Sequence, residues 1–297
     1  MMSIPTDPAL LVEGFFDAAT STVTWLVLDL ASRQCAVIDS VLDYDAPSGR
    51  TSTAGAERLL ARIAELGASV QWHLETHIHA DHLSAAHWLR ERVGGTLGIG
   101  RRITDVQRVF GKLFNAGADF VPDGRQFDHL FDDGEVFMIG SVAATAMHTP
   151  GHTPGCMTFV VPGRQHTFAF VGDTLFMPDY GSARCDFPGG DAVALYRSIR
   201  HVLSLPDVTI LCLCHDYQPG GRAVAIASTV AEQRARNVHV HDGVSEAEFV
   251  AMRTARDATL GKPQLLLPSV QVNMRGGALP EPESNGVRYL KIPLDTL

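Results

Sequence analysis

The run Thr76-His77-Ile78-His79-Ala80-Asp81-His82 places three imidazoles and one carboxylate within six residues. Residues 70–74 before it predict a buried strand, and residues 83–92 after it predict a helix. In an extended segment His77 and His79 project to the same side, so both can reach one ion. A single histidine in such a turn is more often a hydrogen-bonded core residue. Because four potential ligands occur together, the run predicts a metal site.

Further candidate ligands follow later in the chain, at or near the ends of predicted strands. The segment His148-Thr149-Pro150-Gly151-His152 is a turn rich in Pro and Gly, between two alternating apolar runs. Gly172-Asp173 and His215-Asp216-Tyr217 each end a short apolar strand. Taken alone, His148 could simply hydrogen-bond its turn, and an aspartate after a strand is often a turn former. Ligands that arrive repeatedly at strand ends predict one shared metal site.

These motifs together resemble the metallo-β-lactamase superfamily. The resemblance rests on His77-x-His79-x-Asp81-His82, then Pro150-Gly151-His152, then Gly172-Asp173, then His215, and it covers residues 20 to 235 approximately. It implies an α+β fold, the four-layer αβ/βα sandwich, with the metal at one edge of the two sheets. The predicted elements fit this fold, because strands and helices fall into two halves rather than alternating strictly.

Composition narrows the classes of function. The chain has 297 residues, 45% of them hydrophobic and 19% charged, so it can bury a large core. Its net charge of -9 argues against nucleic-acid binding. No apolar run approaches the roughly 20 residues needed to cross a bilayer, and residues 1–19 show no targeting pattern. The five scattered cysteines suit reduced thiols, so we expect a cytoplasmic protein that binds no membrane.

Periodicity and turn residues predict the individual elements. Residues 22–30 and 34–39 predict a β-hairpin, and residues 136–171 predict mainly strands. A further strand is expected near 96–99 and another over 208–214. The segments 43–52 and 117–135 are expected to be loops. Helices are predicted over residues 54–66, 83–93, 103–116, 191–204 and 222–236.

The last part of the chain differs in character from the rest. We divide the chain into a catalytic domain, residues 1–238, and a C-terminal extension, residues 239–297. Ser245 is expected to cap a helix over 245–259, with Glu248 at the capping-box position. The following Gly/Pro-rich stretch cannot form its own core, so the extension must pack on the main domain or on a second subunit. A packing arm is favoured over a catalytic role, and a homodimer is expected.

Within the superfamily the sequence resembles two enzyme classes. In the thiolester hydrolase glyoxalase II, residues matching His77, His79, His152 and Asp173 would hold one ion. Residues matching Asp81, His82, His215 and the shared Asp173 would hold a second ion. The persulfide dioxygenases keep all of these residues but bind a single iron. Resemblance to that family therefore implies one iron in this chain, held by His77, His152 and Asp173. The number of ligands therefore leaves the number of metal ions open.

The flanking residues favour the dioxygenase. Ala80 matches the small residue that the dioxygenases carry within this motif. Arg184-Cys185-Asp186-Phe187 resembles the dioxygenase pattern Arg-Thr-Asp-Phe. His215-Asp216-Tyr217 and Asn273-Met274-Arg275 are also similar. Residues 177–183 resemble the bacterial branch of that family, sometimes called β-lactamase-like hydrolase. The basic cluster with which glyoxalase II binds glutathione is not apparent in residues 247–264.

The resemblance implies a specific chemistry. One Fe(II) per chain would support the oxidation of a thiol persulfide, by analogy glutathione persulfide, with O2 and water to sulfite and thiol. Catalytic roles fall to Asp81, His82, His215 and Tyr217, and substrate binding to Arg184 and Tyr217. His79, Asp81, His82 and His215 would surround the ligands or hold a second ion, and Asp81 is expected to pair with a ligating imidazole. Arg184 could instead form an ion pair with Asp186 or Asp179, and Tyr217 could be an ordinary buried aromatic residue.

The remaining candidates are weaker. Cys185 beside Arg184 could be reactive, but a space-filling thiol is favoured, and core packing is favoured for Cys212 and Cys214. A glyoxalase II-like dinuclear hydrolase is the alternative, followed by a non-enzymatic interaction platform. The persulfide carrier stays open, and a rhodanese-type sulfur transferase would be a separate partner chain. Seven histidines lack a ligand-like context: His73, His87, His129, His166, His201, His239 and His241.

Overall fold

The first half of the chain forms a six-stranded mixed sheet. The computed structural model describes residues 4–117 and 120–296. The strand order in this sheet is β1-β2-β3-β6-β8-β9. The predicted hairpin is confirmed as the antiparallel pair β2 and β3, and β3, β6, β8 and β9 run parallel to one another. The strands are β1 Leu10–Asp17, β2 Thr22–Asp29, β3 Gln34–Ile38, β6 Ser69–Leu74, β8 Thr96–Gly100 and β9 His129–Phe131.

The second half of the chain forms a second six-stranded sheet. Its strand order is β10-β11-β12-β13-β14-β15, and only β13 and β14 pair in parallel. The sheet follows the chain order, as expected from the run of predicted strands. Its strands are β10 Glu135–Ile139, β11 Val142–His148, β12 Met157–Pro162, β13 Thr167–Phe170, β14 Ile210–Cys212 and β15 Ala227–Thr229.

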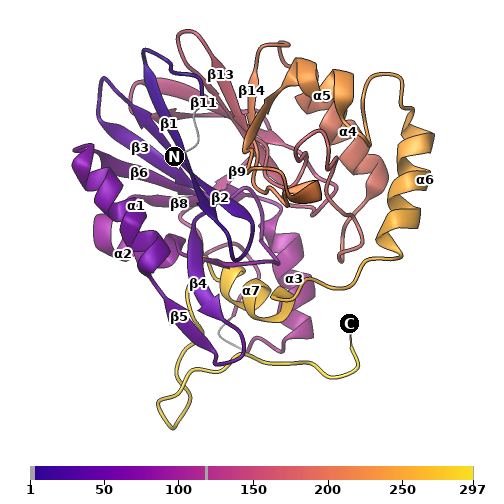
Figure 1. Ribbon diagram of the computed structural model, residues 1–297. Helices are drawn as coiled ribbons and strands as arrows, with labels where there is room; N and C mark the ends of the chain where they lie inside the picture. Colours follow the sequence, from indigo (N-terminus) through magenta and orange to yellow (C-terminus); the bar gives the residue numbers. More distant parts are fainter. Residues whose placement is uncertain (1–3, 118–119, 297) are drawn as a thin grey trace.

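Helices cover the outer faces of both sheets, which gives the expected four layers (Figure 1). Helices α1 Ala54–Glu65, α2 Ala86–Val93 and α3 Ile103–Leu113 accompany the first sheet, and α4 Ala192–Val202, α5 Val230–Arg236 and α6 Glu246–Asp257 accompany the second. The inner faces meet in one apolar core, where Val27 of β2 packs with Phe159 and Phe168. Alternate residues of β2 face outward, so Leu26 and Leu28 pack with α1 and α2 residues instead.

Several predicted boundaries were wrong. The predicted loop over residues 43–52 contains strands: β4 Val41–Asp45 pairs with β5 Arg50–Ser52 and with β7 Leu83–Ser84. Because β7 occupies residues 83–84, α2 begins three residues after the predicted start. The helix predicted from residue 222 begins only at Val230, because β15 occupies residues 227–229; a short 3-10 turn (η1, Pro219–Gly221) lies just before residue 222. Strand β4 pairs with β7, about forty residues further along the chain, and local periodicity does not reveal such pairing.

The C-terminal extension packs on the catalytic part. Ser245 caps α6 through the predicted capping box with Glu248. Helix α6 packs against α4, with Phe249 buried in the same cluster as Leu195 and Ile199. A further helix that we had not predicted, α7 Leu266–Asn273, packs against β7 beside the His-rich turn. Among residues 4–117 and 120–296, no helix is long and apolar enough to span a bilayer.

Candidate metal centre

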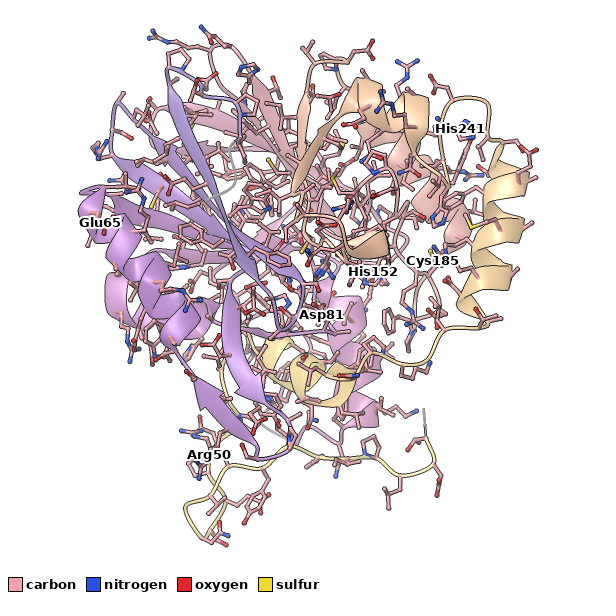
Figure 2. The ribbon with its side chains drawn as sticks, in the orientation of Figure 1. Arg50, Glu65, Asp81, His152, Cys185 and His241 are labelled. Atoms are coloured by element: carbon pink, nitrogen blue, oxygen red, sulfur yellow. The ribbon has the colours of Figure 1, made fainter. Side chains whose placement is uncertain are left out.

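The predicted ligands meet at one edge of the two sheets. The His-rich turn leaves the end of β6, His152 lies in the β11–β12 connection, and Asp173 and His215 follow β13 and β14. The two sheets are joined at this edge, where the Val23 amide donates to the Cys214 carbonyl at 2.7 Å. Asp81 and His152 point into this interior region, whereas His241 lies at the periphery (Figure 2). Strand ends from both sheets therefore supply one site.

Glycine brings the Asp173 loop close to the His-rich turn. Gly172 has φ of +50°, and a Cβ at this position would lie 2.5 Å from the Thr76 hydroxyl oxygen. A side chain at residue 172 would therefore be strained and would also push the loop away from Thr76. The glycine lets the Asp173 carboxylate approach the imidazole of His77.

His77, His152 and Asp173 form a compact set of donors. Their potential ligand atoms all lie within 4.8 Å of one another. The Asp173 Oδ2 atom lies 3.9 Å from His77 Nε2 and 3.6 Å from His152 Nε2. All three residues are buried. Two imidazoles and one carboxylate thus lie close together, and they are the set that the resemblance to persulfide dioxygenases implies for one iron.

The hydrogen bonds of the two imidazoles leave Nε2 available. The His152 Nδ1–H donates to the Arg184 carbonyl at 2.8 Å, and a carbonyl can only accept, so the Nε2 lone pair is free. His77 Nδ1 lies 3.0 Å from the Thr76 hydroxyl, which itself donates to Asp39. His77 Nε2 and Asp173 Oδ1 are buried and find no hydrogen-bond partner in the part of the chain that the structure describes. Such unsatisfied buried atoms are expected where a cation completes the site, so the donors fit a metal ion.

A second group of potential ligands lies beside the first. Asp81 Oδ2 lies 3.2 Å from His82 Nδ1 and 3.6 Å from His215 Nε2, which is also 3.3 Å from Asp173 Oδ1. His82 Nε2 and His215 Nε2 are buried, and no described residue hydrogen-bonds to either atom. The imidazole partners of Asp81 in the described chain are thus His82 and His215, rather than His77 or His152 of the compact set. They remain a donor set suited to a second cation.

His79 is held by two buried carboxylates. Its Nε2 lies 3.0 Å from Asp39 Oδ1 and 3.3 Å from Glu75 Oε2. Burial alone would lower the pKa of His79, but the Asp39 charge raises it well above its ordinary value. Burial and the neighbouring His79 instead lower the pKa of His77 well below its usual range. His77 is thereby kept neutral and able to ligate, while His79 is tied to the carboxylates.

A cavity of about 620 Å³ opens above the metal donors. His152, Asp173 and Tyr217 line it, and residues 260–265 of the extension form part of its wall. The Tyr217 ring stacks on His215 with centroids 5.5 Å apart, and its side chain is exposed toward the cavity. The extension therefore shapes the space in which a substrate would sit.

Arg184 forms the ion pair with Asp186 that the sequence offered as the alternative to substrate binding. Its guanidinium pairs with both oxygens of Asp186 at 2.6 Å and donates to the Gly261 carbonyl at 2.8 Å. Arg253 is also committed, because it pairs with Asp257 at 2.5 Å. Arg256 lines the same cavity, and among the residues that the structure describes it forms no ion pair. The sequence did not single out Arg256, because only the ion pairs of the folded chain show which arginine is left to bind a substrate.

The other cysteine and histidine predictions can be placed as well. Cys185 is buried, its amide donates to Asp257, and burial raises the pKa of its thiol, which favours the inert form. His148 hydrogen-bonds the Pro154 carbonyl across its turn. Cys214 is not only a packing residue, since its sulfur lies with donor atoms of His79 and His215 within 4.8 Å of one another.

Comparison with known proteins agrees with this architecture. Residues 19–215 match the family model of the metallo-beta-lactamase superfamily. The chain belongs to this superfamily. It is 65% identical over 292 residues to a Burkholderia pseudomallei protein named a probable metallo-hydrolase, covering 96% of this chain and 99% of that one. It is 47% identical to glyoxylase B2 of Dictyostelium discoideum, covering 96% and 97%.

Other superfamily relatives carry a different name. Human mitochondrial persulfide dioxygenase ETHE1 is 34% identical over 269 residues, covering 90% of this chain and 89% of that protein. The crystal structure of ETHE1 from Myxococcus xanthus superimposes with a TM-score of 0.70 at 28% identity, covering 90% of this chain and 100% of that one. The β-lactamase hydrolase-like protein of Xylella fastidiosa strain 9a5c is 50% identical, and this chain spans 65% of its length.

Proposed function

We propose that this superfamily member is a persulfide dioxygenase with one Fe(II) held by His77, His152 and Asp173. The observation that carries the proposal is the convergence of these three donors, with His77 Nε2 and Asp173 Oδ1 buried and unsatisfied. Two histidines and one carboxylate on one face are the ligand set of non-haem Fe(II) oxygenases. The similarity to persulfide dioxygenases over nine-tenths of the chain supports the same reaction.

Bound Fe(II) would supply the redox chemistry that the activation of O2 requires and that zinc lacks. In the overall reaction one persulfide, one O2 and one water give one thiol and one sulfite, with two protons released. Phe176 and Phe187 line the cavity beside the donors and reduce the access of water. Tyr217 is exposed and lines the cavity, so its hydroxyl would hydrogen-bond the substrate.

We propose glutathione persulfide as the substrate. The cavity of about 620 Å³ falls in the range of roughly 300–1,000 Å³ typical of sites for small organic ligands. A tripeptide thiol carries carboxylates, and Arg256 is the cation of this cavity that has no ion-pair partner among the described residues. Arg256 therefore takes the carboxylate-binding role that the sequence had given to Arg184.

A thiolester hydrolase is the second candidate. It is favoured by the unsatisfied Nε2 atoms of His82 and His215 near Asp81, which suit a second cation. The names of the Burkholderia and Dictyostelium relatives point the same way. In this alternative the two ions would activate water toward a thiolester carbonyl.

One set of measurements separates the two candidates. Metal content is measured on protein produced with iron and zinc supplied equally, and the same sample is assayed with glutathione persulfide for O2 uptake and sulfite. A parallel assay follows cleavage of S-lactoylglutathione. We expect about one iron per chain with stoichiometric O2 consumption. Two metal ions per chain with thiolester cleavage and no O2 uptake would refute the dioxygenase proposal.

A further inference from the structure

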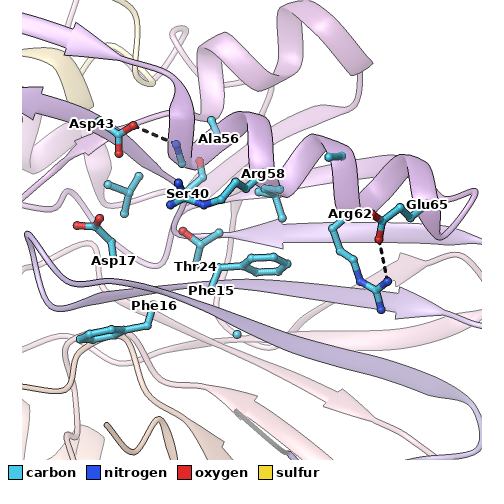
Figure 3. Close-up of a pocket in the computed structure, with 15 residues that line it drawn as sticks. Phe15, Phe16, Asp17, Thr24, Ser40, Asp43, Ala56, Arg58, Arg62 and Glu65 are labelled. Atoms are coloured by element: carbon cyan, nitrogen blue, oxygen red, sulfur yellow. Dashed lines mark hydrogen bonds and ion pairs between the residues drawn. The ribbon is translucent and has the colours of Figure 1, made fainter. Parts of the chain in front are cut away.

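A second cavity lies apart from the metal donors, between β1, β4 and α1 (Figure 3). Its volume is about 520 Å³, similar to that of the cavity above the metal donors, and it contains none of the predicted metal ligands. The proposed reaction gives it no role. Its lining combines an apolar wall with a small set of polar groups, the composition expected of a small-molecule site.

The polar groups gather at one end of this cavity. Ser40 is only 2% exposed, and within residues 4–117 and 120–296 its hydroxyl has no hydrogen-bond partner. The Arg58 guanidinium forms no ion pair among the residues that the structure describes, and it lies at the same end as Ser40 and Asp17 (Figure 3). A buried hydroxyl without a partner costs free energy, which a ligand acceptor at this position would recover.

The two acidic residues at this end differ in how far they are engaged. Asp43 accepts from the Gly55 amide at 3.0 Å and so satisfies the start of α1. Asp17 accepts from the amide and hydroxyl of Thr20 through Oδ2, which leaves its Oδ1 available. Among the described residues, the polar end of the cavity thus presents one guanidinium without an ion pair, one hydroxyl without a partner, and two carboxylate oxygens without a hydrogen bond, Oδ1 of Asp17 and Oδ1 of Asp43.

The rest of the lining is apolar or already satisfied. Phe15, Val41 and Leu59 form a wall against which an aliphatic group can pack. Arg62, at the opposite end, is bound to Glu13 at 2.7 Å and to Glu65 at 3.1 Å. Its charge is therefore not available to a ligand. Because the polar groups lie at one end and the wall beside them is apolar, the cavity suits a ligand with a charged end and an apolar side chain.

We propose that this cavity binds an α-amino acid with an aliphatic side chain. Its carboxylate lies against Arg58 and accepts from the Ser40 hydroxyl, and its ammonium group donates to Asp17. Its side chain packs on Phe15 and Leu59. A simple carboxylate would meet the Asp17 charge without compensation, and a simple amine would meet the Arg58 charge, so both bind more weakly than the zwitterion.

The position of Ser40 connects this cavity to the metal centre. Ser40 directly follows Asp39, whose carboxylate accepts from the Thr76 amide at 2.7 Å and pairs with His79. The Ser40 carbonyl accepts from the Ala85 amide at 3.0 Å, next to the His-rich turn. An amino acid bound at Ser40 would therefore contact a residue whose backbone, with the adjacent Asp39, hydrogen-bonds to Thr76 and Ala85 on either side of the His-rich turn. It is bound without being transformed, because the cavity offers no metal donor set and no activated nucleophile.

Calorimetric titration of the full chain tests the proposal with three related probes. L-leucine carries both charges, 4-methylpentanoate lacks the ammonium group, and leucinamide lacks the carboxylate. We expect leucine to bind with one site per chain, and the other two probes to bind at least about tenfold more weakly. No binding of leucine at millimolar concentrations, or equal affinity for 4-methylpentanoate, would overturn the assignment.

Three variants locate the site. In Arg58→Gln we expect the affinity for leucine to fall about tenfold or more, and in Ser40→Ala several-fold. Arg62→Gln is the matched control, because its guanidinium is already paired at the other end of the cavity, and its affinity for leucine should match wild type. Since Arg58 is exposed, its replacement leaves the core intact. If Arg58→Gln binds leucine as tightly as the wild type does, leucine occupies another site and the proposal fails.

Discussion

The side-chain amide of Asn273 donates hydrogen bonds to the backbone carbonyls of His79, at 2.9 Å, and of His82, at 2.8 Å. Its oxygen accepts from the Ser84 amide at 2.8 Å. All of these groups are buried, so the end of α7 fixes the backbone of the turn that carries the predicted metal ligands. The C-terminal extension therefore supports the metal centre as well as packing on the catalytic part.

Replacing Asn273 by alanine is expected to weaken metal binding. The two carbonyls and the Ser84 amide lose their partner inside the protein, which should cost about 3 kcal/mol of the free energy of unfolding. The His-rich turn also loses its anchor, and the affinity for metal should fall about tenfold. Chelator competition measures the affinity, and urea denaturation measures the stability.

Gln271→Ala is the matched control for Asn273. Gln271 lies on the same helix and also uses its side-chain amide, but it bonds to the carbonyls of Leu267 and Lys291. We expect this variant to lose stability while its metal affinity stays at the wild-type value. An equal loss of metal affinity in both variants would show that α7 acts only through general stability.

Ligand variants test the number of metal ions. If His77, His152 and Asp173 hold a single iron, His152→Ala should contain almost no iron, whereas His82→Ala should keep about one ion per chain. His82 contacts Asp81 and Thr22 but lies outside the compact set of three donors. Metal analysis of both purified variants provides the answer. A fall from two ions to one in His82→Ala would support the dinuclear hydrolase.

The two arginines of the metal cavity should behave differently. Arg256→Gln removes the unpaired guanidinium, and we expect the KM for glutathione persulfide to rise about tenfold with little change in kcat. Arg184→Gln breaks the pairing with Asp186 and the bond to Gly261, so it should mainly lower the thermal stability. Arg236→Gln, on the exposed face of α5, is the control. A larger KM effect in Arg184→Gln than in Arg256→Gln would restore the role predicted from sequence.

Much of the fold could be predicted because its elements carry local signals. The β2–β3 hairpin has continuous apolar strands, and α1 has helical periodicity that ends at Gly67, whose φ is +56°. Strands β4 and β5 lack such signals, since β5 is fully exposed and three residues long. Helix α7 begins with Leu266-Leu267-Pro268. The proline argues against a helix in the sequence, but it lies in the first turn of α7, and packing on β7 stabilises the helix.

The metal donors could be predicted from sequence because strand ends deliver them to one edge of the sheets. The groups that hold these donors in place could not be predicted from the sequence. The Arg184 carbonyl that fixes His152 is a backbone group, which any residue at that position could supply. Asp39 follows a strand as Asp173 does, but only the folded chain shows that it binds the Thr76 amide and His79. Contacts between residues far apart in the chain leave no local pattern.

Asp7 is expected to make the stability of the protein depend on acid pH. Its carboxylate is nearly buried and accepts hydrogen bonds from four backbone amides, those of Ala9, Arg164, Gln165 and His166. Burial alone would raise the pKa of Asp7, but these bonds hold it well below its ordinary value. The carboxylate thereby ties the start of the chain to the β12–β13 turn.

The sign of this pH dependence follows from the direction of the shift. A carboxyl group with a lower pKa in the folded chain stabilises the fold above its unfolded pKa of about 3.9, and this contribution is lost as the pH falls below that value. Asp7→Asn cannot accept as many bonds, so at pH 7 it should unfold with about 2–3 kcal/mol less free energy than wild type. The difference should shrink as urea denaturation is repeated at lower pH. Asp207→Asn, which loses only an exposed ion pair with Arg234, should stay close to wild type throughout. A constant difference between Asp7→Asn and wild type from pH 7 down to about pH 3 would show that the charge of Asp7 contributes nothing.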